Sequence, residues 1–418
     1  MKAEPPLSLR SRRLGRSFDL LAAYPGHGGF HLERDGLGVS GSSGRGDIQL
    51  GLAHGDEAGI RGLAERAVAQ LRALHRGRPS PVAIGTVGFD ESAGAELSIP
   101  GIATHRAGSD GAWLLELVPE GREPVGVDPK PVIGGSPHDA LSQVQIRERP
   151  TPEVYAAAVS RAVSEIRDGA LRKVVLARTI EVEAGRELDP RRLLHHLRAV
   201  EPHAYSFAVP IGLDASLVGA SPELLVSRHR LQVRSNPLAG SAPRSGDPEE
   251  DRENARALAD SAKDREEHAI VVDAMTEVLR PSCDELSWDP EPVLHETANV
   301  WHLSTRFRGT LREPAPSVLE LVAALHPTPA VCGAPRSEAL ELIRELESFD
   351  RGRYSGAVGW IDAAGDGEWV IALRCAELEG DRAMLYAGAG VVADSVPDRE
   401  VDETDRKFRA FLDALRWG

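Results

Sequence analysis

Residues Ser261 to Leu279 read SAKDREEHAIVVDAMTEVL, and this stretch predicts an amphipathic helix with a carboxylate on its apolar face. Apolar residues from Val271 onward recur at the spacing by which a helix turns one side toward a protein core. One turn earlier the same stripe carries Glu267, and Asp264 lies a further turn back. An ionised carboxylate is costly to bury without a compensating cation or hydrogen bonds, so this stripe indicates a functional site.

The C-terminal stretch, from about Pro397 to Trp417, predicts a second helix of the same kind. Beside its apolar stripe, Glu400, Glu403 and Lys407 share a face at i, i+3 and i+7. Two helices that each present a Glu and a second acidic residue suit a Mg²⁺ ion that also holds an anionic ligand. For the last helix, a solvated charged face is an equal alternative.

The composition of the 418 residues, with 41% hydrophobic and 27% charged, is typical of a soluble globular protein with a sizeable core. The formal charge of −15 argues against binding of nucleic acid, which needs a basic surface.

Three widely separated cysteines exclude a disulfide framework or a standard zinc site and favour the cytoplasm. We expect no membrane span and no signal peptide, because no apolar stretch is long enough.

Runs of strands alternate with groups of helices, which favours one large α+β domain over a regular βαβ array. Pro119–Pro137 is dense in Pro and Gly and reads as an exposed connection, either a boundary or a large loop. It separates an N-terminal part, residues 1–140, from residues 150–418, and the role of residues 1–80 stays open. Strands are predicted at 173–182, 205–209, 224–236, 298–309, 355–361, 369–377 and 383–387. Helices are predicted at 58–74, from 151, at 248–259, 261–279, 317–325 and 337–347, and at the C-terminus.

Two further features lie on predicted strands. Lys173 opens the strand 173–182 and faces either solvent or a cavity, where a neutral amine could act as a base. The run Tyr386–Ala393 (YAGAGVVA) fits a G-x-G-x-x-A dinucleotide fingerprint, but only 25 residues follow, too few for the ribose-binding part of that fold. We interpret it as a strand-to-helix turn whose backbone N–H groups approach an anion.

Taken together, ten motifs resemble the chorismate-utilising enzymes and, among them, the isochorismate synthases. In chain order they are Lys173–Arg178 (KVVLAR), Gly219–Leu225 (GASPELL), Asn236–Ser241 (NPLAGS), Lys263–His268 (KDREEH), Val300–Leu303 (VWHL), His326–Gly333 (HPTPAVCG), Tyr354–Gly359 (YSGAVG), Ala372–Arg374 (ALR), Tyr386–Gly390 (YAGAG) and Glu400–Lys407 (EVDETDRK). They span residues 150–418, whereas the N-terminal third resembles the family only loosely. The resemblance implies a single chorismate-binding domain, a β-sheet sandwich flanked by helices as in anthranilate and aminodeoxychorismate synthases.

The same resemblance implies a metal site. Glu267 and Glu403 would bind Mg²⁺, with Asp264 and Glu400 as supporting carboxylates, and the ion would hold the ring carboxylate of chorismate. Arg374 and Lys407 would bind the enolpyruvyl carboxylate. The other substrate-binding positions that it implies are Gly240, Ser241, His302, Ala330, Tyr354, Gly388 and Gly390.

It implies the acid and the base as well. Lys173 would deprotonate a water that attacks C2 of the ring, and Glu223 would protonate the C4 hydroxyl as it leaves. The reaction needs both groups, because hydroxide leaves poorly without an acid and water attacks poorly without a base.

The family's reactions differ in their nucleophile and in whether pyruvate is then eliminated. Its ammonia-using members resemble one another in carrying Gln at the position of Lys173, which favours water here. Salicylate synthases tend to read I-A-G-T and Q-H-L-G where this chain has Leu238–Ser241 and His302–Thr305. We therefore expect an isochorismate synthase, with salicylate synthase as the alternative and a non-catalytic ligand-binding homologue as a third hypothesis. The product would feed siderophore, menaquinone or specialised-metabolite synthesis through an isochorismatase or lyase, and the family favours a monomer or weak dimer.

Overall fold

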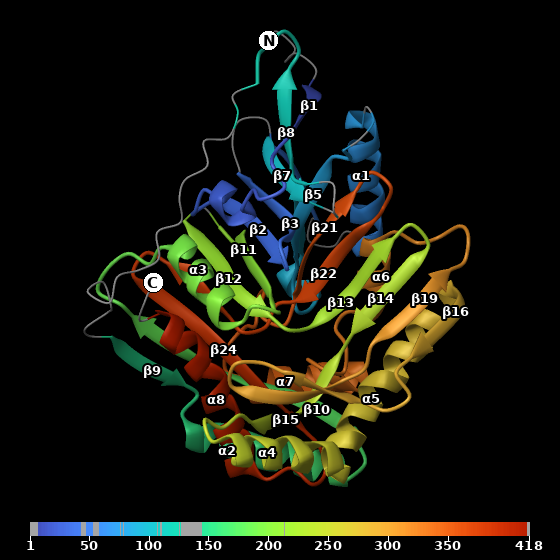
Figure 1. Cartoon of the computed structure of the whole chain (residues 1–418). Coiled ribbons are helices and arrows are strands. Elements are labelled where there is room, and N and C mark those ends of the chain that lie inside the picture. Colours follow the sequence, from blue (N-terminus) through green and yellow to red (C-terminus); the bar gives the residue numbers. More distant parts are fainter. Residues whose placement is uncertain are drawn as a thin grey trace.

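The structure is a computed structural model that describes residues 7–42, 47–52, 58–75, 77, 79–106, 108, 111–124, 126, 144–212 and 214–415. Within these ranges, two large antiparallel sheets and a small third sheet are surrounded by helices (Figure 1). This arrangement confirms the predicted α+β class and the sandwich core. The predicted boundary at residues 119–137 lies largely outside the described residues.

The first large sheet combines strands from both ends of the chain. In spatial order it contains β1 (Leu7–Arg13), β8 (Trp113–Pro119), β7 (Ile102–Arg106), β3 (Leu37–Ser42), β2 (Gly29–Arg34), β11 (Tyr205–Pro210), β12 (Ala215–Ser221), β23 (Cys375–Glu379), β24 (Arg382–Val391), β10 (Lys173–Glu183) and β20 (Gly333–Ala334). The short strand β9 (Gln145–Arg149) also pairs with β10.

The second large sheet is similarly mixed, and the third is small. The second contains β16 (Cys283–Trp288), β19 (Phe307–Leu311), β14 (Gln232–Asn236), β13 (Leu224–His229), β22 (Gly367–Ile371), β21 (Ala357–Asp362), β5 (Val82–Val87), β6 (Ala95–Ile99) and β4 (Ile48–Gly51). The third contains β15 (Leu238–Pro243), β18 (Val300–Ser304) and β17 (Val293–Glu296). Since N-terminal strands extend both large sheets, this part of the chain belongs to the same sandwich.

Eight helices cover the sheets within the described ranges. They are α1 (Gly59–Leu74), α2 (Pro152–Arg167), α3 (Pro190–Val200), α4 (Pro248–Asp260), α5 (Ala262–Leu279), α6 (Val318–Leu325), α7 (Arg336–Leu346) and α8 (Pro397–Leu415). α5 begins where the sequence predicts, because the Ser261 hydroxyl accepts a hydrogen bond from the Asp264 N–H and caps its first turn. None of these helices has the length and apolar character that crossing a bilayer requires.

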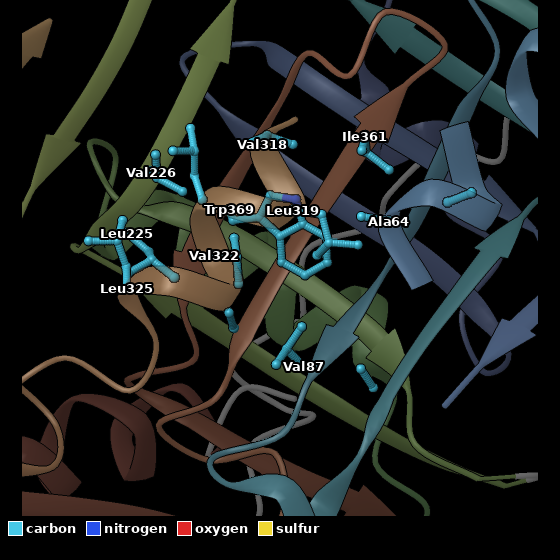
Figure 2. Packing of buried hydrophobic residues seen from close by; sticks show 14 of the residues in the cluster. Ala64, Val87, Leu225, Val226, Val318, Leu319, Val322, Leu325, Ile361 and Trp369 are labelled. Atoms are coloured by element: carbon cyan, nitrogen blue, oxygen red, sulfur yellow. The ribbon is translucent and has the colours of Figure 1, made fainter. Parts of the chain in front are cut away.

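Trp369 on β22 is the centre of one apolar cluster, which joins the second sheet to α6 (Figure 2). Its ring is fully buried, with Val318 and Val322 of α6 in the same cluster. A Cβ at Gly359 on β21 would overlap the Trp369 ring, so only glycine fits opposite it. A second cluster contains residues of both large sheets, Phe207 on β11 and Val370 on β22 among them, and is the interior of the sandwich.

The chain passes between the two large sheets at several points, and we call two of these links the crossovers. At the first, Pro222 and Glu223 join β12 to β13; at the second, Ala372 to Arg374 join β22 to β23. Arg374 has a φ of +49°, an uncommon value for a residue with a side chain. Each crossover carries one ionisable side chain, Glu223 in the first and Arg374 in the second.

Three segments that the sequence predicts as single strands each contain two strands in the structure. The segment 224–236 is a hairpin that turns at Arg230, where φ is +56°. Segments 298–309 and 369–377 each split into two strands of different sheets. The prediction of a strand-to-helix turn at Tyr386–Ala393 is wrong, because β24 continues through Gly388 and Gly390 to Val391.

Candidate functional site

One cavity gathers most of the residues that the motifs single out. Those that line it are Glu223, Gly240, Ser241, Glu267, His302, Ala330, Tyr354, Arg374, Gly388, Gly390, Glu403 and Lys407. Ala330 and Tyr354 lie in loops, and the others come from both crossovers, from β15, β18 and β24, and from the helices α5 and α8. Lys173, Asp264 and Glu400 are not among its lining residues, although Lys173 contacts Glu267. The cavity is therefore formed jointly by the first and third sheets, the two crossovers and two helices.

Glu267 is buried on α5, at 6% exposure, as its place on the apolar stripe predicts. Its Oε1 lies 3.0 Å from Nζ of Lys173, which is fully buried on β10. Burial alone would raise the pKa of Glu267, but the ammonium groups of Lys173 and Lys263 outweigh it and hold the pKa below its ordinary value. Glu267 thus carries a negative charge at the cavity wall.

Glycine is required opposite this carboxylate. A Cβ at Gly390 on β24 would overlap Glu267 Oε1 and lie 3.2 Å from Cε of Lys173. Gly388 is crowded too, since a Cβ there would lie 3.1 Å from the Tyr354 hydroxyl. The glycines of the Tyr386–Gly390 motif therefore make room for functional side chains along a strand rather than forming a turn.

Further carboxylates cluster where α5 meets α8. Burial, the Glu403 charge and Glu267 together raise the pKa of Glu400 to about 7, although Lys263 Nζ lies 3.0 Å from Glu400 Oε1. Burial raises the pKa of Asp264 as well, assisted by Glu267 and Glu403. The alternative of a solvated face on α8 is wrong, because Glu400 is buried at 2% exposure.

The clustered carboxylates have the donor chemistry of a site for a hard divalent cation. Glu267 and Glu403 both line the cavity, and carboxylate oxygens are the ligands that Mg²⁺ prefers. The repulsion that raises the pKa of Glu400 is the kind of interaction that a bound cation relieves. Within the described residues, no three His, Cys, Asp or Glu side chains are already placed to hold one metal ion. An ion here would need further ligands, such as a substrate carboxylate and water.

Glu223 occupies the first crossover and has a different environment. Its side chain is buried at 2% exposure, and its N–H donates to the Ser221 hydroxyl over 3.2 Å. Burial raises the pKa of Glu223 to about 8, against the opposing effect of Lys173 and Lys407. At neutral pH this carboxyl therefore holds a proton, which it can donate into the cavity.

Two cations face the same space. Lys407 on α8 donates to Gly388 O over 2.7 Å and pairs with Glu403 Oε1 at 2.6 Å. Arg374, on the second crossover, donates from Nη2 to His302 Nε2 over 3.1 Å. Tyr354 stacks on Tyr386 with ring centroids 4.9 Å apart. The cavity thus offers two cationic groups for an anionic ligand beside an aromatic wall.

The sequence did not assign roles to two basic residues that support this site. Lys263 pairs with Glu400, and its position four residues before Glu267 on α5 is the signal that could have revealed it. Arg178, fully buried on β10, donates from Nε to the Thr404 hydroxyl over 2.8 Å and forms an ion pair with Asp405. It thereby fixes α8 at the two residues that directly follow Glu403.

Known proteins resemble this chain in sequence and fold. The family model described as chorismate binding enzyme matches residues 134–416. The protein named isochorismate synthase DhbC, from Bacillus subtilis (strain 168), is 42% identical over 362 residues, which are 84% of this chain and 85% of that protein.

Two solved structures have the same fold. DhbC from Bacillus anthracis is 37% identical, with a TM-score of 0.81 over 96% of this chain and 99% of that one. MenF, the menaquinone-specific isochorismate synthase from Escherichia coli, is 23% identical, with a TM-score of 0.82 over 99% of this chain and 95% of that one. At the latter identity the likeness concerns the fold alone.

Proposed function

Because this chain belongs to the family of chorismate-binding enzymes, we propose that it is an isochorismate synthase. In this reaction water adds at C2 of the chorismate ring while the C4 hydroxyl leaves and the double bond shifts. The observation that carries the proposal is Glu223, a protonated carboxyl that faces a cavity with two cations and a carboxylate cluster. Such a site can bind a dianionic substrate and still supply a proton to a leaving hydroxyl.

The substrate's carboxylates have separate partners in this proposal. Arg374 and Lys407 bind the enolpyruvyl carboxylate, because they are the two cations that line the cavity. The Tyr354 hydroxyl and backbone groups near Gly240, Ala330 and Gly388 complete the binding surface. Restriction of the substrate between these groups orients C2 toward the base and C4 toward the acid.

Lys173 is the proposed proton acceptor for the attacking water. Its Nζ pairs with Glu267 and lies behind the cavity wall, so Glu267 must turn away before this amine can reach a water molecule. Glu223, on the first crossover, is the proton donor to the C4 oxygen. One group takes a proton and the other gives one, so the net proton count of the enzyme is unchanged after each turnover.

Mg²⁺ is the proposed cofactor, held by Glu267 and Glu403 with Asp264 and Glu400 behind them. When bound, the ion would neutralise and orient the ring carboxylate of the substrate. Lys263 limits the repulsion within the cluster by pairing with Glu400.

The protein is proposed to act in the cytoplasm on free chorismate, as a monomer or weak dimer, with an isochorismatase or lyase downstream. Its three cysteines are free and buried, in agreement with a reducing compartment. The alternative product is salicylate, which requires elimination of pyruvate after the first step.

A coupled assay distinguishes these outcomes. Purified protein, chorismate and Mg²⁺ are incubated with lactate dehydrogenase and NADH, and isochorismate is measured by chromatography. We expect isochorismate in a reversible mixture with chorismate and no NADH oxidation until a lyase is added. NADH oxidation without lyase, together with salicylate fluorescence, would indicate a salicylate synthase, and unchanged chorismate would indicate a non-catalytic homologue.

A further inference from the structure

His302 on β18 connects Arg374 to the backbone of the adjacent strand β15. Its Nε2 lies 3.1 Å from Arg374 Nη2, and its Nδ1 lies 3.2 Å from Gly240 O and 3.0 Å from the Ser241 hydroxyl. The ring is 6% exposed, at the wall of the cavity. Both ring nitrogens are therefore engaged by protein atoms.

These partners determine the tautomer of the imidazole. A guanidinium can only donate, so His302 Nε2 must be the unprotonated nitrogen that accepts from Arg374. A carbonyl can only accept, so Nδ1 carries the hydrogen and donates to Gly240 O. In agreement, burial and the charges of Arg374 and Lys407 hold the pKa of His302 well below its ordinary value. The ring is neutral and has one hydrogen, on Nδ1.

A neutral acceptor has a specific consequence for Arg374. No ion pair among the described residues includes this guanidinium within 4 Å. A carboxylate partner would orient Arg374 equally well but would cancel the charge that attracts an anionic substrate. An imidazole acceptor fixes one end of the side chain and leaves its positive charge available.

We propose that His302 is a positioning residue, which holds the guanidinium of Arg374 in the cavity through its neutral Nδ1–H form and does not itself bind the substrate. This role depends on the proposed chorismate reaction, in which Arg374 binds a substrate carboxylate. It revises the expectation that His302 is a direct substrate ligand.

Three substitutions separate the contributions of shape, acceptor and charge. His302→Gln retains a neutral acceptor for Arg374 and a donor for Gly240 O, so its KM for chorismate should stay within about threefold of the wild-type value. His302→Leu removes the acceptor, and its KM should rise about 10- to 100-fold with kcat little changed. His302→Glu keeps an acceptor but neutralises Arg374, so its KM should rise at least as much as that of His302→Leu.

His295→Leu is the matched control, because His295 pairs directly opposite His302 in the third sheet but does not line the cavity. It should leave KM unchanged. A wild-type KM in His302→Leu would overturn the proposal. Equal damage in His302→Gln and His302→Leu would also overturn it, because the imidazole itself would then contact the substrate.

Nitrogen NMR of the histidine-labelled full-length protein gives a readout independent of turnover. The His302 resonances, assigned by their loss in His302→Gln, should show a protonated Nδ1 and an unprotonated Nε2 at neutral pH. A protonated Nε2 would contradict the contact with Arg374. Absence of chorismate turnover in the wild type would contradict the proposed function instead, so the two failures are distinguishable.

Discussion

Glu267 lies directly against the backbone of Gly390, in the space that any larger residue on β24 would fill with its Cβ. The carboxylate belongs to α5 and the glycine to the first sheet, so this contact sets how closely the helix approaches the strand. It also keeps Glu267 Oε1 within 3.0 Å of Lys173.

Gly390→Ala should therefore displace the Glu267 carboxylate without unfolding the protein, because the overlapping atom is the end of a flexible side chain. We expect kcat/KM to fall by about 10²-fold or more, as for other displacements of about 1 Å in a catalytic group. Gly246→Ala is the control, since a Cβ there meets nothing within 4 Å. Steady-state kinetics and thermal melts of both variants test this; wild-type activity in Gly390→Ala would contradict it.

Glu223→Gln keeps the shape of the side chain and removes its dissociable proton. If Glu223 protonates the leaving hydroxyl, kcat should fall about 10²- to 10⁴-fold. KM should change little, because the amide still fills the same space. Stopped assays with chromatographic detection of isochorismate measure the residual rate, and a rate near that of the wild type would assign the acid to another group.

The pH profile depends on the same carboxyl. Burial raises the pKa of Glu223 to about 8, so the acid is protonated below that value and loses its proton as the pH rises through it. The wild-type kcat/KM should therefore fall on the alkaline side with an apparent pKa near 8, and this alkaline limb should be absent from the residual activity of Glu223→Gln. A limb that persists unchanged in the variant would belong to a different group.

The carboxylate cluster should show graded Mg²⁺ dependence. Glu267→Gln and Glu403→Gln remove proposed ligands and should abolish turnover at ordinary Mg²⁺ concentrations. Asp264→Asn and Glu400→Gln remove supporting groups and should raise the half-saturating Mg²⁺ concentration about 10- to 100-fold. Glu277→Gln, on the exposed side of α5, serves as the control. Activity that survives EDTA in the wild type would rule out the metal.

Arg178→Lys tests the anchor of α8. The fully buried guanidinium contacts Thr404 and Asp405 at once, and a lysine ammonium cannot reproduce this fork. Loss of these contacts should lower the free energy of unfolding by about 2 kcal/mol, measured by urea denaturation. Arg161→Lys, whose ion pair with Glu165 is exposed, should leave the urea midpoint close to that of the wild type.

The site could be predicted largely because its helices have a visible period. On α5 the apolar stripe identified Glu267 as buried, and on α8 the i, i+3, i+7 spacing put Glu403 and Lys407 on one face. The ten motifs then indicated the remaining lining residues, although they lie on elements far apart in the chain.

The strand boundaries could not be predicted to the same extent. Segment 369–377 is uniformly apolar up to Arg374, and nothing in the residue types signals the positive φ at which the chain leaves one sheet for the other. The hairpin at Arg230 likewise lacks the Gly or Asn that such turns favour. Gly388 and Gly390 suggested a turn, but in the structure they leave room for the side chains of Tyr354 and Glu267. Glu267 lies on a helix more than 100 residues earlier in the chain, so the sequence near the glycines does not reveal this contact.

The two crossovers link chemistry to the order of folding. Glu223 and Arg374 each lie on a link between the large sheets, and the strands beside them pair in both sheets, β12 with β23 in the first and β13 with β22 in the second. Both sheets therefore hold the proton donor next to the anion-binding residue. The cavity also requires Glu267 of α5, Glu403 of α8 and His302 of the third sheet, so catalytic competence arises only after these elements have docked on the sandwich. Recovery of turnover during refolding should therefore lag behind the return of secondary structure. The enzymatic rate then reports when the sheets and helices have packed together.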